Sequence, residues 1–194
     1  EIDYDETTPV DVDGEPGAAS SLAVGQVVAV VADNGSQRLR ARHVAVHAAL
    51  RGPVSAIDSA NGEIVVLGQR VQIGRGAIFH NEVAGTVQGV AGLGHDSFVR
   101  VHGLRAKDGV LVATRIDHVP PSDRVVVSGA MARDATGRVA VAGVKLADAV
   151  RPRPELATVA GSVHGMAAGR WNAAALWRSV RREGGSTAQE RAPE

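Results

Sequence analysis

The feature of this sequence that most restricts its fold is an internal repeat. Residues 22–30 align with residues 93–101, and residues 41–44 align with residues 113–116 after one inserted residue. Segments that recur in the same order at a nearly fixed spacing indicate successive copies of one supersecondary unit. The chain is therefore expected to contain related units, and a gap in one unit can be judged by its sibling.

The repeated segments have the period of β-strands. Residues 98–102 and 138–141 alternate apolar and polar side chains, which is typical of half-buried strands. Valine, which favours pleated surfaces, is frequent. Turn dipeptides such as Asn34-Gly35, Asn61-Gly62 and Asp108-Gly109 separate the alternating segments. Short strands divided by tight turns predict an all-β chain.

Residues 52–121 are predicted to form the complete unit. A glycine-rich connection over residues 74–96, with valines at helical spacing, divides three strands from two. This order is that of a five-stranded Greek-key barrel of the oligonucleotide/oligosaccharide-binding (OB) type. The expected strands span residues 54–58, 63–67, 70–73, 97–103 and 110–118. The fold prediction is therefore all-β, with tandem small OB-like five-stranded Greek-key barrels.

The units on either side are incomplete. Residues 1–51 align only with the later strands of the complete unit, which predicts a partial first barrel incomplete at its N-terminus. Residues 122–178 are predicted to form a shortened third barrel, whose central connection contracts to about residues 148–155. In its last part, residues 172–177, alanines favour a helix but the repeat places a strand, and we follow the repeat. Residues 179–194 are expected to be a flexible tail.

A barrel without its opening hairpin exposes unpaired strand edges and an uncovered apolar face. Two explanations stay open at this point. The hairpin was lost with a preceding segment, which is the simpler explanation because the chain starts at Glu1 and not at Met. Alternatively, another chain supplies the missing strands, and assembly by strand addition is then the function.

Several motifs of the second unit resemble a known family. Residues 52–58, the Asn61-Gly62 turn, residues 66–71 and residues 108–116 resemble the bacterial domain-of-unknown-function family 5666. The resemblance covers the second unit fully and the first and third units partly. It implies exported proteins with tandem copies, and hence an extracytoplasmic location that is periplasmic, cell-surface or secreted. It implies no catalytic residues.

Charge and composition argue against several classes of partner. The 21 basic and 21 acidic residues give a formal net charge of zero, which removes the electrostatic attraction to nucleic acid. Aromatic residues make up only 3%, so the stacking platform that OB-type barrels use is missing. No apolar run is long enough to span a bilayer as a helix. We expect no nucleic-acid partner and no transmembrane segment.

The candidate metal ligands are histidines, because the chain has seven histidines and no cysteine. His43 and His47 would lie about 13 Å apart along a strand, too far to share an ion. His80, His95 and His102 are the candidate metal site, at one barrel mouth. Their alternative role is that of solvated surface side chains, and alternation turns His102 and His164 outward from their barrels.

No enzyme motif is present. The glycines of residues 89–94 follow no βαβ pattern, and no nucleophile elbow, zinc-protease helix or phosphate loop occurs. The acidic residues 11–15 are expected to form a solvated loop. The sequence predicts a non-enzymatic extracytoplasmic structural or protein-interaction module without a cofactor. The alternatives are a periplasmic metal-binding or ligand-sensing domain that uses surface histidines, and a glycan-binding domain with an exposed Trp171 or Trp177.

Overall fold

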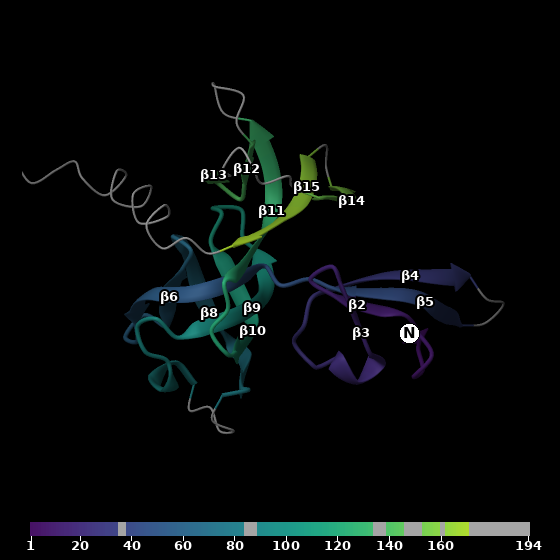
Figure 1. Ribbon diagram of the computed structural model, residues 1–194, viewed down its shortest axis with the longest axis horizontal. Helices are drawn as coiled ribbons and strands as arrows, with labels where there is room; N and C mark the ends of the chain where they lie inside the picture. Colours follow the sequence, from purple (N-terminus) through teal and green to yellow (C-terminus); the bar gives the residue numbers. More distant parts are fainter. Residues whose placement is uncertain (35–37, 84–88, 134–138, 146–152, 160–161, 171–194) are drawn as a thin grey trace, which may run out of the picture.

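The structure is a computed structural model that describes residues 1–34, 38–83, 89–133, 139–145, 153–159 and 162–170 (Figure 1). Its regular elements in these ranges are β-strands and two short 3-10 helices. The prediction of an all-β chain is therefore confirmed. None of the described residues lies in a helix of the length and apolar character needed to cross a membrane.

The centre of the molecule is a closed five-stranded barrel. It consists of β6 (Leu50–Asp58), β7 (Glu63–Val66), β8 (Gln69–Asn81), β9 (Phe98–Arg105) and β10 (Leu111–His118). The strands pair in the order β6-β7-β8-β10-β9, and β9 pairs back to β6. The β8–β10 pairing is parallel and the other four are antiparallel. The prediction of a five-stranded barrel in this part of the chain is thus confirmed.

Alternation along the strands fills the barrel with aliphatic side chains. Nine of them have no exposed surface: Leu50, Val54, Ile64, Val66, Val71, Val99, Val101, Leu111 and Ile116. Burial of a side chain of this size contributes roughly 1.5–3 kcal/mol. Phe98, the first residue of β9, is also buried, with only 4% of its side chain exposed.

The connection between β8 and β9 is shorter than predicted. Residues 74–81 continue strand β8, and residues 78–81 pair in parallel with β10, so the loop prediction is wrong for them. The glycines favour a loop by their sequence. In the structure they lie in β8 where its pairing with β10 shifts register, between Ala113 and Arg115 of β10. A Cβ at Gly74 would lie only 2.9 Å from the carbonyl oxygen of Ala113, so the close approach requires glycine. The 3-10 helix η2 (Gly89–Gly92) follows.

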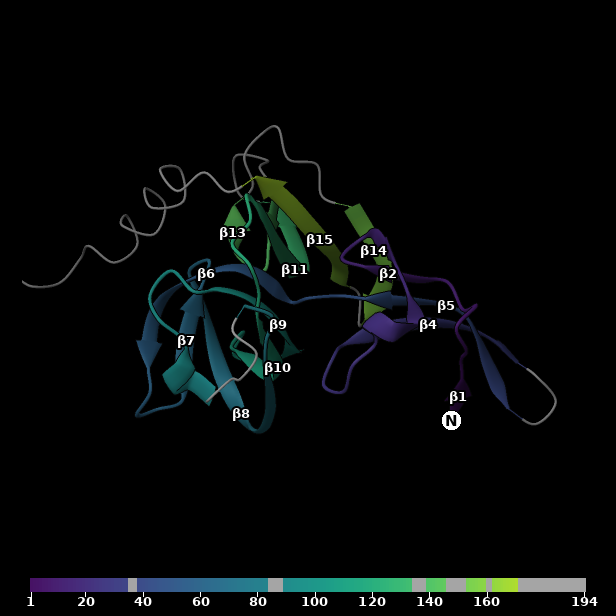
Figure 2. The same ribbon diagram turned by 60° about the horizontal axis from the view of Figure 1, so that its bottom comes forward.

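Residues 1–46 form a second sheet, which we call the first sheet. Its elements are β1 (Ile2–Asp3), β2 (Val10–Val12), β3 (Glu15–Gly17), the 3-10 helix η1 (Ala19–Ser21), β4 (Val28–Asn34) and β5 (Leu39–Val46). The strand order is β1-β5-β2-β3, and β4 pairs with β5. In Figures 1 and 2, β4 and β5 project away from the barrel, and the chain continues from β5 into β6.

The first sheet repeats the register of three barrel strands. Under the sequence alignment, β1 and β2 correspond to β8, β4 to β9 and β5 to β10. Three residue pairs of the first sheet align with residue pairs of the barrel. The pair Ile2–Leu39 corresponds to Val71–Leu111, the pair Val10–Val44 to Phe79–Ile116, and the pair Val30–Val44 to Val101–Ile116. The antiparallel ladders also shift register at equivalent places, next to Arg42 and next to Thr114. Among the described residues, β6 and β7 have no counterparts in the first sheet.

The last part of the chain forms a sheet that is open in the described residues. It contains β11 (Arg124–Arg133), β12 (Val139–Val141), β13 (Val144–Lys145), β14 (Arg153–Val159) and β15 (Ser162–Arg170), in the order β13-β12-β11-β15-β14. Strand β11 also pairs with the start of β6. The turn between β12 and β13, like that between β7 and β8, has two residues with positive φ.

The three predictions for this part meet different outcomes. Residues 153–155 were expected in a loop, and this is wrong because they begin β14, which β15 supports as an antiparallel neighbour. The predicted strand over residues 172–177 and the predicted tail over residues 179–194 lie outside the described residues, as do Trp171 and Trp177.

Candidate interaction site

The outer edge of β4 has no neighbouring strand in the part of the chain that the structure describes. The His47 N–H donates to the Val27 carbonyl at 3.0 Å, so the polar backbone groups of Val27 face β5. Backbone groups of successive strand residues point to opposite sides. The N–H and C=O groups of Val28 and Val30 therefore point to the open edge.

The same position in the barrel is occupied. The Val119 N–H donates to the Phe98 carbonyl at 2.9 Å, which is the counterpart of the bond between His47 and Val27. On the other side of β9, the carbonyl of Val101 accepts a hydrogen bond of 2.8 Å from the Ala49 N–H, just before β6. Strand β6 thus covers the edge of β9 that corresponds to the open edge of β4.

The inner face of the first sheet is partly uncovered next to this edge. Three apolar side chains there are substantially exposed: Ile2 by 40%, Val28 by 43% and Leu39 by 37%. Their barrel counterparts are completely buried: Val71, Val99 and Leu111. Because the registers are the same, the difference in exposure comes from β6 and β7, which cover the barrel face and have no counterpart in the first sheet among the residues that the structure describes.

The other end of the inner face is packed. Val10, Ala41, Val44 and Val46 are buried, and helix η1 and Leu22 lie against them. The barrel closes the corresponding end with η2 and Leu93. The first sheet therefore has a small core of its own and an open side.

The sequence of the open edge lacks the usual protection. Residues 27–32 are all valine or alanine, with no charged residue and no proline. Exposed edge strands normally carry lysine, proline or inward charges that prevent pairing with another strand. The composition and the open backbone groups together make β4 suitable for strand addition.

The first sheet is held against the outer face of β9 and β10 by polar contacts. The Thr114 hydroxyl donates to the Gly25 carbonyl at 2.7 Å, and Arg115 Nη1 donates to the Val24 carbonyl at 3.1 Å. A Cβ at Gly25 would lie 3.0 Å from the Cβ of Arg115, so glycine permits this close approach. These contacts fix the chain immediately before β4.

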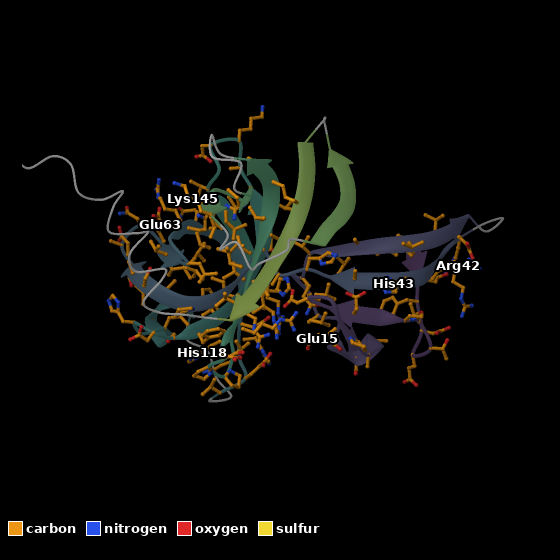
Figure 3. The ribbon with its side chains drawn as sticks, turned by 45° about the horizontal axis from the view of Figure 1, so that its top comes forward. Glu15, Arg42, His43, Glu63, His118 and Lys145 are labelled. Atoms are coloured by element: carbon orange, nitrogen blue, oxygen red, sulfur yellow. The ribbon has the colours of Figure 1, made fainter. Side chains whose placement is uncertain are left out.

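Asp13 is the second anchor between the two sheets. It is only 2% exposed, accepts a hydrogen bond of 2.8 Å from the Ala48 N–H and lies 3.8 Å from Arg100 Nε. Arg124 donates to the Asp13 carbonyl at 2.8 Å and pairs with Glu15, which Figure 3 places between the two sheets. The prediction of a solvated acidic loop is therefore wrong for Asp13. The Asp13-Gly14 dipeptide, a hairpin turn with positive φ at both residues, was the signal that could have located the β2–β3 turn.

His102 lies in the middle of this interface. It faces outward from the barrel, as alternation predicts, but it is fully buried because the first sheet covers it. Its Nδ1 is 3.1 Å from the carbonyl oxygen of His47, and its Nε2 is 3.9 Å from Asp117 Oδ2. Burial lowers the pKa of His102, and the nearby Asp117 carboxylate opposes that effect.

The structure separates the three predicted metal ligands. His80 Nδ1 and His102 Nε2 lie 3.7 and 3.9 Å from the Asp117 carboxylate, whereas His95 is exposed in the loop before β9. Arg115 Nε is 2.7 Å from the same carboxylate. In the described ranges, no three His, Cys, Asp or Glu side chains are grouped so that they could hold a metal ion. The metal site stays a prediction.

Histidine also occurs on the outer face of the first sheet. His43 Nε2 lies 3.0 Å from Asp11 Oδ2, and Figure 3 places His43 on β5 beside Arg42, away from the barrel. The side chain of His164 lies outside the described residues.

Comparison with known proteins gives one result for the barrel. No curated protein and no solved structure matches the chain. Residues 51–117 match the model of a family described as Domain of unknown function (DUF5666). These residues include nearly all of the five barrel strands. Over the barrel, the match confirms the resemblance to domain-of-unknown-function family 5666 that the sequence motifs indicated.

Proposed function

We propose that this chain is a non-enzymatic structural and protein-interaction module of tandem OB-like repeats, which assembles by accepting a β-strand at the outer edge of β4. The strand order of the barrel, with its parallel β8–β10 pair, supports the OB-like assignment. The shared register of the first sheet and the barrel supports the tandem repeat.

The observation that carries the proposal is the exposure of Ile2, Val28 and Leu39 at positions where the barrel buries its side chains completely. Covering each of these partly exposed side chains would contribute roughly 1 kcal/mol. A strand added at β4 would also gain hydrogen bonds to Val28 and Val30. Backbone pairing and apolar burial thus favour the same partner position.

We further propose that the module works outside the cytoplasm. The proposal rests on the family resemblance, which implies exported proteins. Fractionation of cells that produce the natural protein tests it. Recovery in the extracytoplasmic fractions is expected, and recovery with cytoplasmic markers would refute this part of the proposal.

A synthetic peptide with the sequence of residues 50–58 tests strand addition, because β6 occupies the corresponding edge of the barrel. We expect saturable binding, measured by calorimetry, that Val28→Pro abolishes because proline has no N–H to offer. Val28→Ala is the matched control, since it keeps the N–H and should weaken binding only slightly. Equal binding to the proline variant would refute strand addition at β4.

A second candidate function is metal binding by His80 and His102, favoured by their common position beside Asp117. The proximity of Arg115 to the same carboxylate opposes a cation there. Calorimetric titration with Zn²⁺ and Cu²⁺ distinguishes the two functions. Stoichiometric uptake that is lost in His80→Ala supports the metal site, and absence of stoichiometric uptake excludes it.

A further inference from the structure

We infer that the partner of the first sheet is a two-stranded β-hairpin of the β6–β7 type, supplied by another polypeptide, and not a single strand. This inference rests on the proposed function and names its partner. The structural basis is that two edges of the first sheet, one on β4 and one on β1, have no neighbouring strand among the described residues, and that the corresponding barrel strands, β9 and β8, are joined by the hairpin β6–β7.

The first strand of the hairpin has its place on β4. In the barrel, Leu50 and Gly52 of β6 pair with Val101 and Val99 of β9. The corresponding residues of β4 are Val30 and Val28, whose backbone groups point outward. An incoming strand in the register of β6 would therefore meet a row of donors and acceptors that is already in position.

The second strand of the hairpin has its place on β1. In the barrel, Ile64 of β7 pairs with Val71 of β8, and Glu63 pairs with Gln72. Under the alignment, Val71 and Gln72 correspond to the two residues of β1, Ile2–Asp3. Among the strands that the structure describes, β1 pairs with β5 alone, so the edge that β7 would contact is open.

Strand β3 does not fill this position. It pairs with β2 at Val10–Val12, which corresponds to the far end of β8, beyond the part that β7 contacts. The described strands of the chain are also engaged elsewhere, because β6 and β7 close the barrel and β11 has neighbours on both sides. The hairpin must therefore come from outside the described residues.

The exposed side chains distinguish a hairpin from a single strand. Val28 lies on β4, but Ile2 lies on β1, on the other side of the gap. Adjacent strands are about 4.8 Å apart, so one strand on β4 leaves a second strand position empty and Ile2 uncovered. A hairpin with apolar residues at alternate inward positions, as Leu50, Val54, Ile64 and Val66 provide in the barrel, would cover both.

The experiment compares two synthetic probes on the intact chain. One is the peptide of residues 50–58, and the other is the peptide of residues 50–66, held as a hairpin by a disulfide between cysteines substituted for Asp58 and Glu63, which are paired across β6 and β7 in the barrel. The chain itself has no cysteine, so the cross-link stays within the probe. We expect the hairpin to bind at least tenfold more tightly than the strand.

Two variants locate the second strand. Ile2→Ser should reduce hairpin affinity to about that of the strand and leave strand affinity unchanged, because only the hairpin reaches β1. Leu104→Ser is the matched control, since Leu104 is 66% exposed on β9, where it pairs with Val112 of β10, and should alter neither affinity. Amide hydrogen exchange should show slower exchange at β1 with the hairpin only.

The outcomes separate the inference from the proposed function. Equal affinities of the strand and hairpin probes, unchanged by Ile2→Ser, would refute the hairpin as partner but would agree with strand addition. Failure of both probes to bind would overturn both. A third outcome concerns the natural full-length protein without any probe. If its β4 amides exchange as slowly as its β9 amides, its own chain fills the edge, and a partner polypeptide is refuted.

Discussion

The first sheet and the barrel have the same strand register and different degrees of closure. β5 follows β10 pair by pair, including the shift beside Arg42 and Thr114, yet Leu39 is 37% exposed and Leu111 is fully buried. Register depends on local alternation and on adjacent strands, both of which the two regions share. Burial depends on the strands that close the barrel, and those are present in one region only.

The two regions also differ in what covers their outer faces. The outer face of β9–β10 carries Arg100, His102, Arg115 and Asp117, and the first sheet packs on it. At two of the equivalent positions, the first sheet has Val31, which is 61% exposed, and His43. The charged interface and the open edge are therefore the features that distinguish two otherwise related sheets.

The largest effect is expected from truncating the matched leucines. Leu111→Ala should lower the free energy of unfolding by about 2–5 kcal/mol, because it leaves a cavity in the closed core. Leu39→Ala should cost less than about 1 kcal/mol, because that side chain is partly in water already. Denaturant unfolding of both variants measures the difference. Equal losses would mean that the first sheet is covered as completely as the barrel.

A medium effect is expected at the interface. Asp13→Ala removes the acceptor of the buried Ala48 N–H and a carboxylate near Arg100, and should cost about 1–3 kcal/mol. Glu82, its counterpart under the sequence alignment, lies 3.4 Å from the same Arg100 but is more exposed. Glu82→Ala should cost less than about 1 kcal/mol. The comparison fails if thermal unfolding reports similar losses for both variants.

The smallest effect is a pH dependence from His102. Its folded-state pKa is lowered by burial, so the unfolded chain binds the proton more readily and stability falls as pH drops below about 6.5. The slope for one group is at most about 1.4 kcal/mol per pH unit. The charged groups around it are Asp117, Arg100 and Asp13.

His102→Val, which introduces the side chain found at the counterpart Val31, isolates this contribution. The variant should be less stable overall at neutral pH, because the His47 carbonyl loses its neighbour. Its stability should change less than that of the natural sequence between pH 7.5 and 5.5, measured by urea unfolding. A parallel pH dependence in the two proteins would remove His102 as the cause.

The sequence predicted those parts of the fold that depend on local pattern. The Asn61-Gly62 turn, the alternation around Val101 and the alignment of the repeats were enough to predict the barrel strands. The extension of β8 was missed because the glycines around Gly74 favour a loop, whereas in the structure they lie at a register shift and β10 pairs with the strand on both sides of it.

The interface could not be predicted in the same way. Alternation correctly turned His102 away from the barrel interior, but its burial depends on distant residues such as His47, which follows the first sheet and whose carbonyl lies against the imidazole. Asp13 and Arg100 are distant in sequence, and no local spacing brings them together. Whether a side chain on the outer face of one sheet is exposed depends on whether another sheet packs against it. The residue pattern within either sheet does not contain that information.

Amide hydrogen exchange at Val28 and Val30, compared with Val99 and Val101, tests the central claim most directly. These residues are equivalent in register, and β6 covers the edge of β9 whereas no described strand covers that of β4. Exchange at Val28 and Val30 should be fast in the chain alone, and exchange at Val99 and Val101 should approach the slow limit set by global unfolding. Equally slow exchange at all four residues would contradict an open edge on β4.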